Sequence, residues 1–167
     1  MKRLILAVLV LVPLSACETW NAWTGGALAP AATADPDCLP VHLPEDAATH
    51  IVSKGEGPLD ISATVSLRMA GVTCHTADGQ VQQEVTLVFD AMRGAALKKG
   101  DDISVPYFAA VVDAAGGVSA KKEYSVAFAF DEEMTEKREV AISIGLSTAQ
   151  AEKATLYIGF DKPSAPK

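Results

Sequence analysis

Apolar and polar side chains alternate through most of the chain after residue 39, and this pattern limits the fold more than any other feature. The clearest run places five apolar residues at every second position from Ile61 to Met69. The same alternation recurs at residues 85–89, 124–130, 140–146 and 156–160. A period of two is typical of a strand with one buried and one solvated face. The pattern therefore predicts a domain built almost wholly of β-strands.

Turn residues separate these segments at the places where strands need them. Asp78-Gly79 lies just before a segment that starts at Gln80, and Asp-Gly between alternating segments is a strong hairpin signal. Residues 113–117 end in two glycines, which suit a second tight connection. Residues 147–150, Ser-Thr-Ala-Gln, have the spacing of a capping box and predict one helical turn. The charged residues 131–139 are expected to form a loop.

About seven strands at this spacing predict an all-β fold, an antiparallel immunoglobulin-like β-sandwich over residues 38–161. Residues 103–112 are apolar on both faces, which indicates a central strand. A lipocalin-like barrel is the alternative, although such a barrel usually needs eight longer strands. The chain has 167 residues, which suits one domain of this size.

The N-terminus has a different composition. Lys2 and Arg3 precede an apolar run that ends at Pro13, too short to cross a bilayer and typical of a secretory signal. Residues 14–17, Leu-Ser-Ala-Cys, resemble the lipobox of bacterial lipoproteins. This resemblance implies a lipoprotein signal peptide over residues 1–16, acyl chains on Cys17, and attachment to a membrane through covalent lipid.

The same resemblance implies a location. Glu18 follows the lipidated cysteine, whereas the familiar signal for retention at the inner membrane has Asp there. We therefore expect a protein anchored in the envelope of a Gram-negative bacterium and facing the periplasm, with the outer membrane favoured over the inner. Residues 17–37 are rich in small residues and proline, which predicts a flexible linker after the anchor. Residues 162–167 are expected to form a disordered tail.

The three cysteines have separate roles in this interpretation. With Cys17 holding lipid, Cys38 and Cys74 remain as a pair. The periplasm is oxidising, so we expect a disulfide between them. Their spacing does not fit a zinc knuckle of the C-x₂-C kind.

Three further segments resemble a known family. They are residues 106–113 (Pro-Tyr-Phe-Ala-Ala-Val-Val-Asp), residues 119–122 (Ser-Ala-Lys-Lys) beyond the glycine turn, and residues 71–74 (Gly-Val-Thr-Cys). Together they resemble an uncharacterised family of Gram-negative envelope lipoproteins, over about residues 38–160. The resemblance implies no assigned activity and no catalytic residues, and it agrees with the β fold.

Residue types that carry chemistry are sparse. His42, His50 and His75 lie in loop-like or strand-end segments, and none has a helical partner four residues away for a metal site. We find no G-x-S-x-G elbow, P-loop or EF-hand pattern. The formal net charge of −7 opposes nucleic-acid binding, which needs a basic patch. We expect no catalytic residue, no metal and no cofactor.

Two functions remain from the sequence. The favoured one is a non-catalytic, lipid-anchored module that binds another envelope protein or supports an assembly. The alternative is a periplasmic enzyme or small-ligand carrier with a site built from dispersed loops. The hairpin from Pro106 to Tyr124 is the candidate binding region, because Tyr107 and Val111 give its second face apolar character. The opposing possibility is that a neighbouring sheet covers that face.

Overall fold

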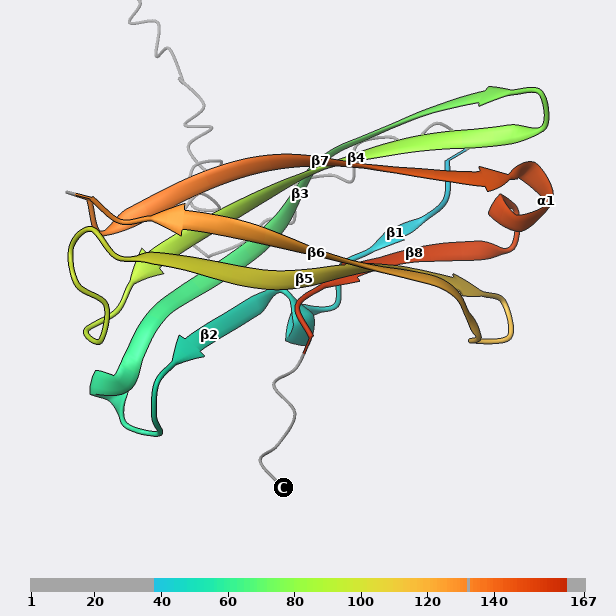
Figure 1. Ribbon diagram of the computed structural model, residues 1–167. Coiled ribbons are helices and arrows are strands. Elements are labelled where there is room, and N and C mark those ends of the chain that lie inside the picture. Colours follow the sequence, from blue (N-terminus) through green and yellow to red (C-terminus); the bar gives the residue numbers. More distant parts are fainter. Residues whose placement is uncertain (1–37, 132, 162–167) are drawn as a thin grey trace, which may run out of the picture. The chain divides into compact units, whose positions relative to one another are not determined.

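The computed structural model describes residues 38–131 and 133–161. The predicted signal peptide, the linker with Cys17 and the predicted tail lie outside these residues. In the part that is described, no helix is long and apolar enough to cross a membrane. The described chain forms two four-stranded sheets (Figure 1).

The first sheet has the strand order β1–β8–β5–β6 and the second the order β2–β3–β4–β7. The first comprises β1 (Val41–His42), β8 (Ala154–Gly159), β5 (Asp102–Asp113) and β6 (Val118–Ala129). The second comprises β2 (Thr49–Ser53), β3 (Ile61–Ala77), β4 (Gln80–Arg93) and β7 (Thr135–Ser147). Short helices connect them: η1 (Glu45–Ala47), η2 (Pro58–Asp60) and α1 (Thr148–Ala151).

The prediction of an all-β sandwich is confirmed, with eight strands in the described ranges rather than about seven. Neighbouring strands are antiparallel except for β1, which pairs in parallel with β8. The protein resembles immunoglobulin domains in having two packed sheets, but its strands are distributed differently between them. A constant-type immunoglobulin domain places its third, sixth and seventh strands in one sheet. Here the first, fifth, sixth and eighth strands share a sheet.

The predicted alternation determines what the two sheets bury between them. On β3, for example, Ala63, Val65 and Leu67 are all at most 4% exposed. The segments predicted from alternation contribute most of the core, which includes Val85, Leu87, Phe89, Val105, Tyr107, Val126, Phe128, Ile142, Leu156 and Ile158. Burying a large apolar side chain stabilises a fold by about 1.5–3 kcal/mol. The prediction of β5 as a central strand is also confirmed, since β5 lies between β8 and β6.

The predicted turns are confirmed. Asp78 and Gly79 both adopt positive φ, 52° and 72°, as a two-residue type I′ hairpin requires. Asp113 Oδ1 accepts hydrogen bonds from the backbone N–H groups of Ala115 and Gly117, at 2.9 and 2.8 Å. Residues 147–150 form the predicted capping box and helical turn.

The expected loop at residues 131–139 is wrong in its second half. Residues 135–139 belong to β7 and pair with residues 88–92 of β4. Apolar alternation does not reveal this half of the strand, because its inward positions are the charged Glu136 and Arg138, which form an ion pair of 3.2 Å. Inward-pointing charges are common on exposed strand edges.

Candidate functional site

One side of the sandwich, where β1 and β2 are the edge strands, is joined across the two sheets by the chain itself. The carbonyl oxygen of Ala47 accepts a hydrogen bond of 2.8 Å from Phe160 N, just after β8 of the first sheet. The next carbonyl, that of Ala48, accepts one of 2.8 Å from Leu67 N on β3 of the second sheet. Two adjacent residues therefore connect the two sheets, and we call this side of the sandwich the closed side.

A disulfide and a buried amide fix the start of the domain. Cys38 and Cys74 are bonded to each other, as predicted. Beside them, Leu39 N donates to Gln83 Oε1 at 2.8 Å, and Gln83 Nε2 donates to Leu39 O at 3.2 Å. Leu39 and Gln83 are both 2% exposed. The first described residues are thus held to β3 by a covalent bond and to β4 by a buried pair of hydrogen bonds.

At the opposite side, which we call the open side, no further described strand pairs with either sheet. There β6 is the edge strand of the first sheet and β7 the edge strand of the second. These two edges approach each other at one end and separate toward the end that carries α1 (Figure 1). The outward backbone groups of an edge strand have no ladder partner, which makes such an edge a template for a further strand.

A cavity of about 190 Å³ lies between β6 and β7 where they separate. We call it the β6–β7 slot; its lining residues are Ala109, Val111, Ala120, Lys121, Lys122, Tyr124, Ser143, Ile144, Gly145, Leu146 and Leu156. Val111 and Leu156, only 4% and 1% exposed, belong to the core and contribute to its floor. Small-molecule sites usually measure about 300–1,000 Å³. The slot is therefore closer in size to a pocket for a protein side chain.

The strand register determines which β6 side chains face the slot. Ala120 pairs with the buried Val111, and Lys122 pairs with the buried Ala109. Directly paired residues point to the same face of a sheet, so Ala120 and Lys122 face the second sheet. Lys122 Nζ lies 5.0 Å from the centroid of the Tyr124 ring. Within the described ranges, no carboxylate forms an ion pair with Lys122.

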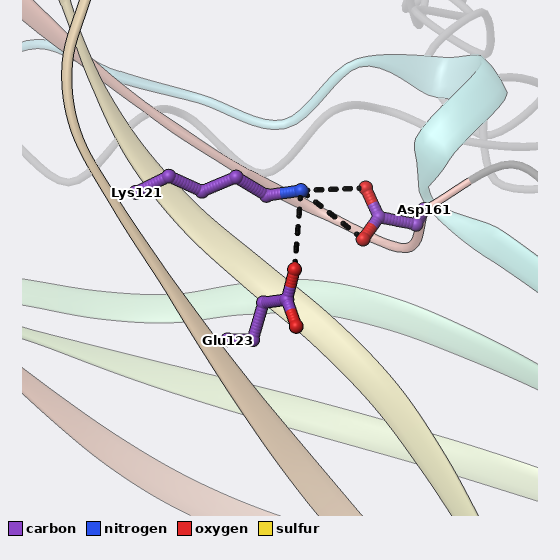
Figure 2. A network of polar contacts seen from close by, with 3 residues as sticks. All are labelled: Lys121, Glu123 and Asp161. Atoms are coloured by element: carbon purple, nitrogen blue, oxygen red, sulfur yellow. Dashed lines mark hydrogen bonds and ion pairs between the residues drawn. The ribbon is translucent and has the colours of Figure 1, made fainter.

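The neighbouring Lys121 points to the other face of β6 and is fully engaged. Its Nζ lies 3.1 and 3.2 Å from the carboxylate oxygens of Asp161 and 3.6 Å from Glu123 Oε1 (Figure 2). It also lies 4.9 Å from the centroid of the Phe108 ring. The hydrogen bond to Asp161 raises the pKa of Lys121 above its usual 10.5. The two adjacent lysines thus differ: among the described residues, Lys121 has two carboxylate partners and Lys122 has none.

The structure corrects the predicted binding face. Tyr107 and Val111 are 2% and 4% exposed and point into the core, because the second sheet covers that face of β5. Tyr107 packs against the rings of Phe89 and Tyr124, with centroids 4.9 and 5.3 Å away. Burial raises the pKa of the Tyr107 phenol, so it remains neutral. Tyr107 cannot contact a partner, and Val111 contributes only to the slot floor.

A broader depression of about 580 Å³ lies on the outer face of the second sheet. Thr64, paired with both Ile51 and Met92 on neighbouring strands, lines it. Ile51 and Met92 are 55% and 54% exposed. Asp90, also in the lining, pairs with Arg68 at 3.3 Å, with both side chains about half exposed. Its lining includes no histidine, the residue that most often acts as a general acid or base in enzymes.

The histidines take up separate places. His42 packs edge-on against Tyr157 with ring centroids 5.0 Å apart, and His50 lies 5.4 Å from Phe160. Burial lowers the pKa of His50 below its usual 6.5. Among the described residues, no group of three or more His, Cys, Asp or Glu side chains is placed to hold a metal ion.

Comparisons with known proteins add one structural likeness. No family model matches the sequence, and no curated protein matches it. Among solved structures, the chain is similar to a crystal structure of a DUF1425 family member from Shewanella sp. pv-4. The two are 15% identical, the match covers 71% of this chain and 94% of that one, and the TM-score is 0.37. An identity and a TM-score this low do not establish a common family.

Proposed function

We propose that the protein is a non-catalytic binding or assembly module of the bacterial envelope, held by lipid on Cys17, and that it contacts another envelope protein at the β6–β7 slot. The observation that supports this proposal is the difference between the two sides of the sandwich. One side is covalently and internally joined, while the other leaves two strand edges beside an apolar floor. Proteins normally cover or charge such edges. Beside the slot, the inward positions of β7 are the apolar Ile144 and Leu146, and no other described strand pairs with this edge, which favours a binding role.

The proposed anchor supports the same function. A lipid on Cys17 followed by a flexible linker would confine the domain to a thin layer near the membrane. Confinement raises the effective concentration of the domain toward other membrane-bound proteins, so even a small contact surface suffices. The outer membrane is the favoured location, because Glu18 follows the proposed lipidated cysteine.

A small-ligand carrier is the second candidate function, and the depression on the outer face of the second sheet is what favours it. Its volume of about 580 Å³ falls within the usual range for small-molecule sites. The depression lies on the solvated outer face of the sheet, where Asp90 pairs with Arg68, and its lining includes no residue of the β6 edge. The module function therefore has the stronger support.

Crosslinking in whole cells tests the proposed contact. A photo-reactive amino acid at the exposed Ser143, on the rim of the slot, should capture one discrete envelope protein. The same amino acid at the exposed Thr49, on the closed side, is the matched control and should capture none. Equal capture at both positions, or none at either, contradicts the proposed function.

Fractionation tests the proposed anchor separately. Cys17→Ser should release the protein from the membrane fraction or leave it unprocessed. If the serine variant is cleaved at the same bond and stays in the membrane, lipid attachment at Cys17 is wrong. This outcome would leave the proposed contact at the slot untouched.

A further inference from the structure

We infer that the ligand of the β6–β7 slot is an extended polypeptide segment of another protein that pairs with β6, sets a carboxylate beside Lys122 and inserts an apolar side chain over Val111. This inference rests on the proposed binding function and specifies the chemistry of the partner. Three observations carry it: the size of the slot, the unbalanced charge of Lys122, and the two-residue spacing of the β6 side chains that face the slot.

The size of the slot selects a side chain rather than a free ligand. A cavity of about 190 Å³ with buried Val111 and Leu156 at its floor accommodates one aliphatic side chain. Half-buried Ile144 and Leu146 of β7 provide the opposite wall. A strand added to β6 presents every second side chain to this space, which is how strand addition combines backbone pairing with side-chain specificity.

The charge of Lys122 favours an acidic residue next to the apolar residue of the partner strand. A strand that pairs with β6 shields Lys122 from water, and a desolvated ammonium group is costly unless a carboxylate lies near it. Lys121, one residue away, already has Asp161 and Glu123 and needs no further partner. Lys122 therefore favours binding of strands that have a carboxylate at the facing position. It disfavours binding of strands without one, so the slot gains selectivity by rejecting them.

The spacing of Ala120 and Lys122 predicts a sequence pattern in the partner strand. Ala120 and Lys122 face the slot and are separated by one residue that points away. Ala120 leaves room over Val111, its pairing partner, and Lys122 attracts the carboxylate. The incoming segment thus carries an acidic and an apolar residue two positions apart. It lacks proline where a backbone N–H must pair with β6.

A second copy of this chain fits the slot less well. If β6 paired with its own copy around Lys122, the two ammonium groups would lie directly opposite each other, which is destabilising. A partner with an acidic strand satisfies Lys122 directly.

Peptide binding to the purified full-length chain in detergent tests the inference. The probe is a fluorescent peptide, Thr-Leu-Thr-Glu-Thr-Leu-Thr, which presents the same pattern in either strand direction; its counterpart has Lys in place of Glu. We expect the Glu peptide to bind about tenfold more tightly than the Lys peptide. Lys122→Glu should reverse this preference, whereas Lys98→Gln, which removes an exposed lysine charge outside the slot lining, should leave it unchanged.

A second pair of variants locates the binding. Ala120→Phe fills the slot from an exposed position and should abolish binding of the Glu peptide, while the urea midpoint stays that of the parent. Ala127→Phe adds the same ring to an exposed position of β6 outside the slot lining and should not affect binding.

Several results would overturn the inference. These are a lack of binding to both peptides, a preference that survives Lys122→Glu, or equal effects of the two phenylalanines. A concentration-dependent dimer that Ala120→Phe disrupts would assign the slot to a second copy instead. If Ser143 captures an envelope protein in cells but the peptide preference is absent, the inference fails and the proposed function stands.

Discussion

The closed side and the open side of the sandwich end the same two sheets in opposite ways. At the closed side, the backbone of Ala47 and Ala48 joins the sheets, and the nearby disulfide and Gln83 fix the chain start. At the open side, β6 and β7 run for 12 and 13 residues as edges. Local stability varies across folded proteins, and binding regions come from its lower end. One side of the domain therefore carries the covalent and backbone links between the sheets, and the other ends in two strand edges among the described residues.

The open side is itself divided along β7. In the first half of the strand, Glu136 and Arg138 pair with Ala91 and Phe89 and so point inward, which charges the edge. In the second half, the inward positions belong to Ile144 and Leu146. Inward-pointing charges are a usual protection against strand addition. Only the apolar half, next to the slot, lacks this protection on β7.

Removing the disulfide should cause the greatest loss of stability at the closed side. Cys38→Ala combined with Cys74→Ala opens a loop with a sequence separation of 36 residues. We expect the free energy of unfolding to fall by roughly 3.5–4 kcal/mol, an upper value from the loss of the chain constraint in the unfolded state. Urea unfolding measures it, and reduction of the parent protein should reproduce the loss. A change below about 1 kcal/mol would mean that the closed side does not depend on this bond.

Gln83→Leu should cause the second greatest loss of stability. It leaves the buried N–H and C=O of Leu39 without partners, which we expect to cost about 2–3 kcal/mol. Gln82→Leu, at an exposed position on the other face of β4, is the matched control and should change stability little. Similar losses in the two variants would show that Gln83 acts through general packing and not through its amide.

Two isoleucines of β7 allow a core position and a slot position to be tested in the same strand. Ile142 is 2% exposed, so Ile142→Ala should cost about 2–4 kcal/mol of stability. Ile144 is only half buried beside the slot, and Ile144→Ala should cost about 1 kcal/mol. Urea unfolding of the two variants measures both losses. Equal costs would mean that the apolar half of the open side is as firmly packed as the core.

The smallest expected effect is a pH dependence on the closed side. Burial against Phe160 lowers the pKa of folded His50 below 6.5, so folding favours the neutral ring. The contribution is fully present above pH 6.5 and is lost as the pH falls through the lower folded pKa. Urea midpoints on both sides of pH 6.5 should show this decline, and His50→Phe should flatten it. The control His75→Gln should retain it; a decline that persists in His50→Phe would assign it to another group.

Local sequence patterns predicted most of the strands and turns, because alternation and turn chemistry act between near neighbours. Asp78-Gly79 specifies its turn through the backbone conformations it allows. β1 has two residues, too few to show any period, and it exists because it pairs with β8. Strand order depends on contacts between distant segments, and no local pattern encodes it.

The site was predicted less well than the fold, for a physical reason. Tyr107 and Val111 lie on an apolar face whether that face is covered or open, so the sequence left both possibilities standing. Only the packing of the second sheet decides between them. Lys121 and Lys122 are the same residue type side by side, and the strand register alone shows that one faces Asp161 and the other the slot.

The disulfide also determines how mechanical force enters the domain. A pull on the chain before Cys38 divides between the backbone to Leu39 and the bond to Cys74, which applies part of it directly to β3. β3 has 17 residues and pairs along almost its whole length with β4. The two-residue pairing of β1 with β8 lies beyond the bond along the chain, so it carries less tension than it would without the disulfide.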